Sequence, residues 1–507
     1  MERTFSYLPF ALAIVGFFLQ SYPRFFNKLF GVDVWTRLLE VEHVRKNNHL
    51  IPHHKLADQF IIDGYFDYPP VFPWLMSFIP KKRLLSIQGF IAPFFDVLQS
   101  LFVFYLTMYV AGTMPEKFYI ALVAQAIYLL TPVIAVENSY LTPRSLGYFI
   151  FSLATVPLIL HAISPNVWFF TAGIVFTTLL FLTHRFAVQA FLFLTIFFTF
   201  YLSTAVFVQS FLIGFALALI LTNGYYLRVL KGHLFNIYFW VTNLDYRYAH
   251  QVRGVIKKDV QTDMVNQVYK LVEVFSPIAI FGMNPWALSG FVIIAVWYLK
   301  ISVVAPVYLA FGAWIVFFYA LGVVVLKVRK LMPIGEGYRY MEMATVPASI
   351  ISSLLLFNYI QRPFSMWLIG GYVALGLVNL MVILFFQIKS VIKDRNRSVT
   401  TEMQTVFAYV NKHSPAKKPM RIICIPHQNT TMTVYHTNAQ VLVNADNPGL
   451  MRVTDVYPVL RMSLNDLKKK YNLSHALVKT GFVTLKELGL REKDAVCKAG
   501  DVLLIKL

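Results

Sequence analysis

The sequence predicts an all-α polytopic membrane protein with a C-terminal soluble α/β domain. Hydrophobic residues make up 57% of the 507 residues, and the mean hydropathy is +0.60. Soluble domains are about half apolar, and one this apolar would expose large apolar patches. Long apolar runs also recur, each near the roughly 20 residues that cross a hydrocarbon core. These runs stop near residue 390, where charged residues and shorter alternating runs begin.

We predict about eleven transmembrane helices, separated by breaks that carry proline, glycine or charge. Examples of such breaks are Gly112-Thr-Met-Pro115 and His161-Ala-Ile-Ser-Pro165. So many spans exclude a cleaved signal peptide as the explanation of the first one. The predicted spans are 6–22, 86–111, 117–134, 144–162, 166–183, 186–203, 206–222, 282–299, 303–326, 342–360 and 365–388.

The chain is predicted to have a transmembrane domain, 1–390, and a soluble α/β domain, 391–507. Two polar segments interrupt the first domain: a large first loop, 23–84, and an insert, 223–281, whose amphipathic end, 264–280, is typical of an interfacial helix. In the soluble domain we expect helices at 401–413 and 463–472, and strands at 421–426, 431–436, 475–480 and 501–507.

Charge and cysteine content restrict the function. The net charge of +20 suits topology, contact with anionic lipids or phosphate binding, whereas the scattered basic residues argue against nucleic acid. Cys424 lies in a strand-like run and is expected to be a buried thiol rather than half of a disulfide with Cys497. The sequence contains no Walker loop, GxGxxG turn, CxxC pair or HExxH motif, so no nucleotide, haem or zinc enzyme is predicted.

The first loop carries the first candidate residues. Asp33 is the N-cap of a helix at 34–48, a general base, or a metal-linked carboxylate that activates an acceptor nucleophile. Asp63 and Asp67 are further candidates, although turn chemistry explains both. His53 and His54 make a weak metal site, because adjacent side chains point apart.

Two more loops alternate onto the face that carries Asp33. Glu137 lies between the third and fourth predicted spans, and Arg144 nearby could neutralise a phosphate. His184 and Arg185 form a tight turn between two spans, where a structural histidine and an interfacial arginine are the simpler interpretations.

Before the tenth span, Tyr338 and Tyr340 flank Arg339 in the run GEGYRY, 335–340. Glycines permit close backbone approach, and an arginine between tyrosines suits a bidentate phosphate contact, although an interfacial anchor explains the pattern equally well. Asp96 lies inside the second span, where an ionisable residue is a functional candidate unless a neighbouring helix binds it.

Taken together, these motifs resemble the membrane-embedded GT-C glycosyltransferases, and most closely the catalytic subunits of oligosaccharyltransferases and their prokaryotic relatives. The run GVDVWTRLLEVEHVRKNNHLIP, 31–52, followed by FDYPPVF, 66–72, is similar to that family's first external loop. The resemblance covers residues 1–390 and implies that Asp33 is the catalytic acid of that loop. It places Glu137 in the second external loop, where the family carries an Asp-X-Asp or Glu-X-Asp motif. LTHR, 182–185, and GEGYRY resemble its polar turn and its phosphate-contacting loop.

The sequence departs from this family in two places. ENS, 137–139, lacks a second acid, which leaves open a divalent ion, Mg²⁺ or Mn²⁺, held by Asp33 and Glu137. The C-terminal domain has no Trp-Trp-Asp motif, so recognition of an asparagine sequon does not carry over.

The resemblance implies transfer of a sugar from a polyprenyl-phosphate-linked donor to a glycan, protein or lipid acceptor. Asp33 would act as base and Glu137 would orient the acceptor or a cation. Arg339 and Arg144, with Tyr338 and Tyr340, would bind the donor phosphate. The reaction would take place at the extracytoplasmic face, with a prokaryotic plasma membrane as the expected location. The basic residues at span ends on the loop-bearing face predict the opposite, cytoplasmic, orientation under the positive-inside rule.

Two other functions remain open from the sequence. A membrane transporter or lipid flippase would use Asp96, Glu137 and Arg339 as coupling or substrate charges, although no repeated half is present. A non-catalytic membrane scaffold would use the C-terminal domain for interaction and would tolerate substitution of Asp33 and Arg339.

Overall fold

A computed structural model of the chain describes residues 7–31, 33–51, 59–62, 66–137, 140–244, 276–359, 365–395, 397–415, 417–443, 454–458 and 460–507. The chain divides into two compact units. Unit 1 comprises Met1–Lys28, Leu85–Tyr226 and Glu273–Lys393, and unit 2 comprises Leu29–Leu84, Leu227–Val272 and Asp394–Leu507. The first loop therefore groups with the C-terminal segment, and the predicted division at residue 390 stays a prediction.

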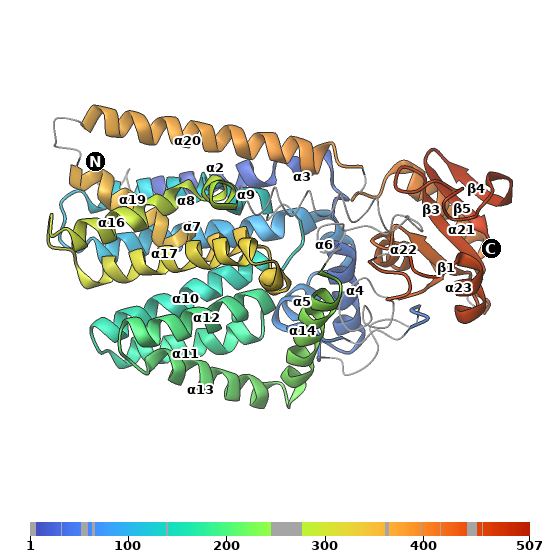
Figure 1. Ribbon diagram of the computed structural model, residues 1–507, viewed down its shortest axis with the longest axis horizontal. Helices are drawn as coiled ribbons and strands as arrows, with labels where there is room; N and C mark the ends of the chain where they lie inside the picture. The colour runs from blue at the N-terminus through green and yellow to red at the C-terminus, as the bar shows by residue number, and fades with distance from the viewer. Residues whose placement is uncertain are drawn as a thin grey trace. The chain divides into compact units, whose positions relative to one another are not determined.

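Unit 1 is helical, and each of the eleven predicted spans contains an apolar helix (Figure 1). In chain order these helices are α2 (Leu8–Ser21), α7 (Ile91–Val110), α8 (Lys117–Leu129), α10 (Arg144–Ile163), α11 (Val167–Phe181), α12 (Arg185–Tyr201), α13 (Val206–Leu221), α16 (Leu288–Tyr298), α17 (Pro306–Lys327), α19 (Thr345–Tyr359) and α20 (Ser365–Gln387). Shorter helices lie between them: α3 (Pro23–Phe26), α9 (Pro132–Glu137), Ser276–Met283 and α18 (Tyr340–Met343).

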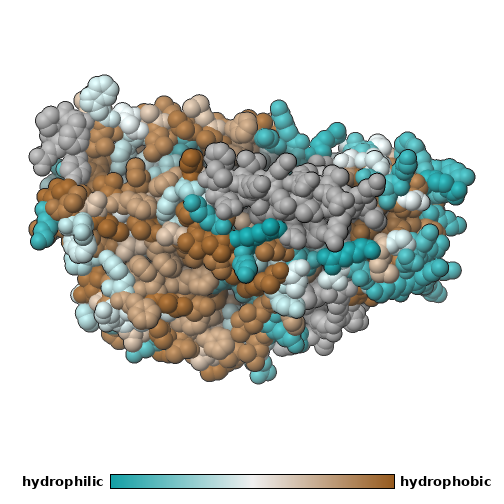
Figure 2. Space-filling model, in the orientation of Figure 1, coloured by the Kyte–Doolittle hydropathy of each residue, from teal (hydrophilic) through white to brown (hydrophobic). Residues whose placement is uncertain are grey.

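The length and composition of the helices agree with a membrane protein, but they do not determine the number of transmembrane spans. Among the described residues, four helices are long and apolar enough to cross a membrane, or up to seven if each of three bent pairs is one span. The helices α2, α8, α11 and α12 are apolar but shorter, so the predicted number of eleven is not confirmed. Figure 2 shows apolar side chains over the helices of unit 1. Helix α20 is an example, because only 11% of its most apolar stretch is buried inside the structure.

The ends of these helices follow local chemistry. The side chain of Asn166 accepts a hydrogen bond from the backbone N–H of Trp168 and so caps α11. Pro306 occupies the first turn of α17, where its missing N–H costs nothing. Between α13 and α14 (Tyr225–Thr242) the helix is interrupted at Asn223 and Gly224, both of which are at positive φ.

Unit 2 is built on a five-stranded sheet in the order β2-β1-β3-β5-β4. The strands are β1 (Arg421–Ile425), β2 (Gln440–Val441), β3 (His475–Lys479), β4 (Ala495–Ala499) and β5 (Val502–Lys506). Strands β2, β1 and β3 are parallel, with Ile425 opposite Val478, and β5 is antiparallel to both β3 and β4. The predicted small α/β domain is thus present, with β2 and β4 added.

Helices cover both faces of this sheet. Ile423, Ile425 and Val478 share a core with Leu464 and Leu467, two residues of α23 (Leu464–Tyr471), which Ser463 caps as predicted. Because side chains alternate across a strand, Cys424 points to the other face. There its sulfur lies 3.5 Å from Thr433 Oγ1 of α22 (Asn429–His436), and α21 (Thr401–His413) packs on β4 and β5. The prediction of a strand at 431–436 is therefore wrong.

The first loop contributes to the same sheet. It contains α4 (Asp33–Lys46), α5 (Val71–Ser77) and the start of α6 (Lys81–Ile87). The segment 59–62 lies beside β2: the backbone N–H of Val441 donates to Gln59 O, and those of Ile61 and Ile62 donate to Val441 O and Leu442 O, all at 2.8 Å. A piece of the first loop therefore covers the edge of the C-terminal sheet.

Two histidines, the buried His427 and the partly buried His436, should make unit 2 sensitive to acid. Burial lowers the pKa of His427 to about 4, and burial together with Lys81 lowers the pKa of His436 to about 4. The ordinary histidine pKa is ~6.5, so below that pH the unfolded chain binds protons that the folded chain does not. We expect the unfolding temperature to be constant above pH ~6.5 and to fall as the pH drops toward 4. Thermal unfolding monitored by a probe in unit 2 measures this, and an unchanged slope in a His427→Gln, His436→Gln variant would contradict it.

Candidate active site

The candidate residues of unit 1 gather where α10 begins and where the chain re-enters the helices at α18. Arg144 is the first residue of α10, and its Nη1 lies 3.7 Å from Glu342 Oε1 in α18. The two side chains are 6% and 0% exposed. Charged groups this deeply buried are retained only when they are partnered. Sequence reasoning identified Arg144 but missed Glu342, which reads in the sequence as one more acid at the start of a span.

Asp96, on α7, contacts Ser145, the residue that follows Arg144 in α10. Ser145 donates a hydrogen bond of 3.1 Å from Oγ to Asp96 Oδ2, and both residues are fully buried. This contact joins α7 to α10 and matches the simpler interpretation, in which a neighbouring helix binds the intramembrane acid. The cluster therefore contains two buried carboxylates with an arginine and a hydroxyl as their partners.

The loop before α18 holds Arg339 in a defined position. Arg339 Nε lies 2.7 Å from Glu336 Oε2, and the hydroxyl of Tyr338 donates to the same carboxylate oxygen. Arg339 remains 30% exposed. A guanidinium carries five N–H donors, so this ion pair engages one edge of the group. Glu336 is a second residue that the sequence analysis did not single out.

Tyr340 points into the helices instead. It is fully buried, its hydroxyl donates to Ile334 O at 3.1 Å, and it accepts from Gln189 Nε2 at 2.8 Å. Gln189, on α12, also donates to Ile334 O. Together these bonds close the loop 334–340 and tie it to α12, which positions Glu336 and Arg339.

Close backbone contact explains one glycine of this loop. A Cβ added at Gly337 would lie 2.2 Å from the carbonyl oxygen of Gly322 in α17, so the chain fits only without a side chain at this position. We expect Gly337→Ala to destabilise the solubilised protein by ~1–3 kcal/mol through overpacking. Gly370→Ala, in α20 where the added Cβ would meet nothing, is the control. Thermal unfolding of the two variants measures the difference, and equal unfolding temperatures would refute the contact.

His184 occupies a structural position. It is the N-cap of α12, where Nδ1 accepts from the backbone N–H of Ala187 at 3.3 Å. Its ring lies edge-on to Tyr148 with centroids 5.6 Å apart. A capping role accounts for a histidine at this turn.

In unit 2, Asp33 is the first residue of α4 and its side chain is exposed. The helix behind it is firmly held. Arg37 makes a buried ion pair of 2.7 Å with Glu40, and its guanidinium lies 3.6 Å from the ring centroid of Tyr68. Trp35 is fully buried. The Tyr-Pro-Pro turn thus stabilises the helix that carries the candidate base.

Of the other candidate loop acids, only Asp67 has a described side chain. Asp67 precedes this turn and is 4% exposed. Asp63, like His53 and His54, lies outside the described residues. Glu137 ends α9, but its side chain is outside the described part of the structure.

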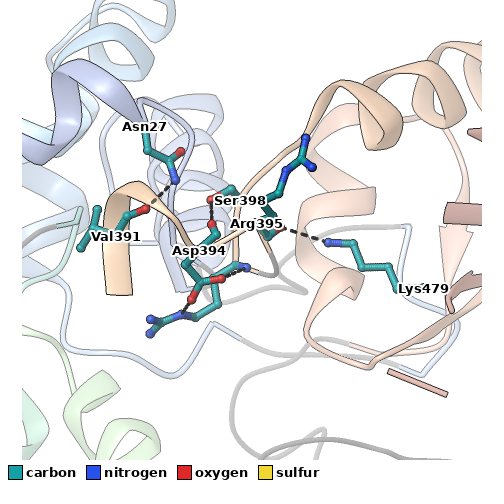
Figure 3. Close-up of polar contacts among 7 residues, drawn as sticks. Asn27, Val391, Asp394, Arg395, Ser398 and Lys479 are labelled. Carbon is teal, nitrogen blue, oxygen red and sulfur yellow. Dashed lines mark hydrogen bonds and ion pairs between the residues drawn. The ribbon is translucent and has the colours of Figure 1, made fainter. Parts of the chain in front are cut away.

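The start of the first loop is held by the strand-like segment that follows the last helix. Gly31 N donates to Arg397 O at 2.8 Å, and Val399 N donates to Leu29 O at 3.2 Å. Figure 3 shows how that segment is braced: Asp394 accepts from Arg397 Nε at 2.7 Å, and Ser398 Oγ donates to Asp394 O. In unit 1, Asn27 Nδ2 donates to Val391 O at 2.8 Å (Figure 3). No sequence motif marked these contacts.

The described residues do not form a metal site. Within the described ranges no group of three His, Cys, Asp or Glu side chains could hold an ion. In the described part of unit 1, Glu342 contacts Arg144, Asp96 contacts Ser145, and Glu336 contacts Arg339. These partners are cations or hydrogen-bond donors, which are the groups that a carboxylate requires and a metal ion does not.

Comparison with known proteins identifies the fold. No protein-family model and no curated protein matches the chain. The oligosaccharyltransferase AglB from Archaeoglobus fulgidus, in complex with an inhibitory peptide and a dolichol-phosphate, superposes with a TM-score of 0.62 at 10% identity, over 94% of this chain and 69% of that one. ArnT from Cupriavidus metallidurans, bound to undecaprenyl phosphate, gives 0.59 at 14% identity, over 100% and 98%.

The A. fulgidus oligosaccharyltransferase in complex with Zn and sulfate gives 0.59 at 11% identity, over 96% of this chain and 71% of that one. These proteins are GT-C glycosyltransferases, so the resemblance predicted from the sequence is confirmed at the level of the fold. At such low identity the likeness shows the fold alone.

Proposed function

We propose that this protein transfers a sugar from a polyprenyl-phosphate-linked donor to an acceptor at the extracytoplasmic face of a membrane. The observation that carries the proposal is the shared fold, which covers 94–100% of the chain in AglB with dolichol-phosphate and ArnT with undecaprenyl phosphate. A lipid-linked donor places its phosphate at headgroup level and its tail among apolar helices. An apolar helical unit with partly exposed basic residues at helix ends suits such a molecule.

In the proposed reaction, a hydroxyl or amide of the acceptor attacks the anomeric carbon, and the bond from that carbon to the phosphate oxygen breaks. The polyprenyl phosphate leaves with the bonding electrons, and Asp33 accepts the proton of the acceptor. Arg339, held by Glu336, and Arg144 stabilise the charge on the leaving phosphate. Tyr338 and Tyr340 set the position of Arg339, and Glu137 orients the acceptor.

Mg²⁺ or Mn²⁺ held by Asp33 and Glu137 is tested by assaying transfer after EDTA treatment and after adding back each ion.

The direct test is transfer by purified protein in lipid nanodiscs supplied with a panel of undecaprenyl- and dolichyl-phosphate sugars. We expect at least one donor to release polyprenyl phosphate together with a glycosylated or hydrolysed sugar. If no donor in the panel is consumed, the proposed activity is wrong.

Topology separates this proposal from a flippase or transporter. Leu50 is 67% exposed in the first loop, and Cys424 is buried, so Leu50→Cys in a Cys497→Ser background gives one reactive thiol. An impermeant maleimide should label it from outside intact cells. Labelling only after permeabilisation would place the loop in the cytoplasm and count against sugar transfer.

A further inference from the structure

The helix α22 of unit 2 is unusually polar for its burial. Its first six residues, Asn-Thr-Thr-Met-Thr-Val at 429–434, are all buried. Some of their hydroxyls bond locally, as when Thr433 Oγ1 donates to Asn429 O at 2.8 Å. A helix packed between a sheet and α4 would ordinarily be apolar, because unsatisfied buried polar groups are costly.

Three side-chain atoms at the start of this helix have no hydrogen-bond partner. They are His427 Nε2, Asn429 Nδ2 and Thr431 Oγ1. Their residues are 3%, 2% and 0% exposed, and all lie within five consecutive positions. More than nine in ten buried polar groups are partnered. Three exceptions within five consecutive positions require an explanation, and a bound ligand would supply their partners.

The position in the sheet is one where α/β proteins bind ligands. After β1 the chain turns to the face covered by α22, on the side of Cys424. After β3, the parallel neighbour of β1, it turns to the opposite face, where Val483 and Leu488 join the core of α23. Adjacent parallel strands whose exits diverge in this way leave a crevice at their carboxyl ends. His427 and Asn429 lie at that edge.

The rim of the edge reaches solvent. Gln428, between the two buried residues, and Thr480 and Phe482, after β3, are partly exposed, and Gly481 is exposed. The edge of the sheet beside the polar side chains therefore meets solvent.

The available groups favour a neutral ligand over a phosphate. Two backbone N–H groups that begin α22, those of Asn429 and Thr430, already donate to Pro426 O and His427 O, and the turn contains no glycine to cradle a phosphate. The buried cation at the end of β3, Lys479, interacts with three carboxylates, Asp501, Asp394 and Glu402, so it adds no net positive charge.

The three side-chain groups without hydrogen-bond partners suit a ligand ring that carries several hydroxyl groups. Thr430 Oγ1 lies 3.5 Å from His427 Nδ1. Donation by this hydroxyl would make His427 Nε2 an N–H donor. Asn429 Nδ2 adds two donors, and Thr431 can both donate and accept. The ring centroid of Tyr457 lies 5.1 Å from that of His427, so an aromatic ring borders these groups. Neutral donors beside an aromatic ring match a sugar.

We propose that the carboxyl edge of β1 and β3, through His427, Asn429 and Thr431, binds a sugar ring of the donor or acceptor. The proposal builds on sugar transfer as the function of the chain, and it assigns glycan binding to the C-terminal domain.

The test measures binding of methyl glycosides of common hexoses and N-acetylhexosamines to the full-length protein in nanodiscs, by saturation-transfer NMR and titration. Thr431→Val and Asn429→Leu should weaken the bound glycoside about tenfold, the loss expected for one or two hydrogen bonds. Neither variant should lower the unfolding temperature of the ligand-free protein, because each removes an unsatisfied group.

Thr433→Val is the matched control in the same helix. Its hydroxyl is already bonded to Asn429 O, so this variant should lower the unfolding temperature and leave glycoside affinity within about twofold. The proposal is overturned if no glycoside binds, if Thr431→Val and Asn429→Leu bind as the wild type does, or if sugar-free undecaprenyl phosphate displaces the glycoside. Binding by an Asp33→Asn protein that transfers no sugar supports the site, and binding without any transfer by the wild type would reject the transferase alone.

Discussion

Asp33→Asn is expected to lower the rate of sugar transfer by roughly 10²–10⁴-fold, the range that a positioned general base contributes. Asparagine keeps the size of the side chain but cannot accept the acceptor's proton. The loss should fall on kcat, because Asp33 is needed when the bond forms rather than when the donor binds. Initial rates over a series of donor and acceptor concentrations measure this separation.

The unfolding temperature separates this loss from a folding defect. Asp33 is exposed, and α4 is also held by the buried Arg37–Glu40 pair and by Trp35. The unfolding temperature should change little. Asp494→Asn, the same chemical change at a surface ion pair with Arg491, is the control and should keep its activity within about twofold, because surface pairs contribute little. Equal rates for Asp33→Asn and the wild type would remove Asp33 as the base.

Glu342→Gln should destabilise unit 1 by ~3–5 kcal/mol, the usual cost of removing one partner of a buried ion pair. Arg144 is 6% exposed, so its charge would lose the carboxylate without gaining water. Unfolding midpoints of the detergent-solubilised protein in a denaturant series measure the effect. In the transfer assay the same variant should also lose activity, since Arg144 is proposed to contact the donor phosphate.

An exposed pair provides the comparison. Arg395 and Glu402 lie 3.6 Å apart with side chains 77% and 30% exposed, so Glu402→Gln should destabilise the protein much less than Glu342→Gln. A double variant, Arg144→Met with Glu342→Gln, should recover much of the stability but not the activity, because neither charge of the pair remains. Comparable losses for Glu342→Gln and Glu402→Gln would show that the buried pair has no special importance.

The helical unit was predictable because the signal for each helix lies within its own residues. An apolar run of sufficient length between polar breaks specifies a helix wherever it packs. Local patterns also fixed α21 and the capped α23. They failed at 431–436, where the alternation of TMTVYH is typical of a strand, because the packing of Thr433 onto Cys424 and of α22 onto α4 decides the structure there.

The residues of the candidate site also divide into those with a local sequence signal and those without one. In the loop GEGYRY, the arginine and the glycines could be recognised from the sequence alone. The structure explains Gly337, because its backbone lies against the backbone of Gly322. The partners of those residues are far away in the chain. Neither the pairing of Arg144 with Glu342 nor the role of Gln189 has a local signature, because a single sequence carries no record of which distant segments meet.

The hydrogen bonds between Gln59–Ile62 and Val441–Leu442 also fix an order of events during synthesis. Residues 59–62 leave the ribosome early, but their partner strand is made only after the whole helical unit has been translated. The loop that carries Asp33 is thus among the first segments produced and among the last to be completed. Until then its strand lacks a partner, so the first loop reaches its final structure only after the strands of the C-terminal sheet have been made.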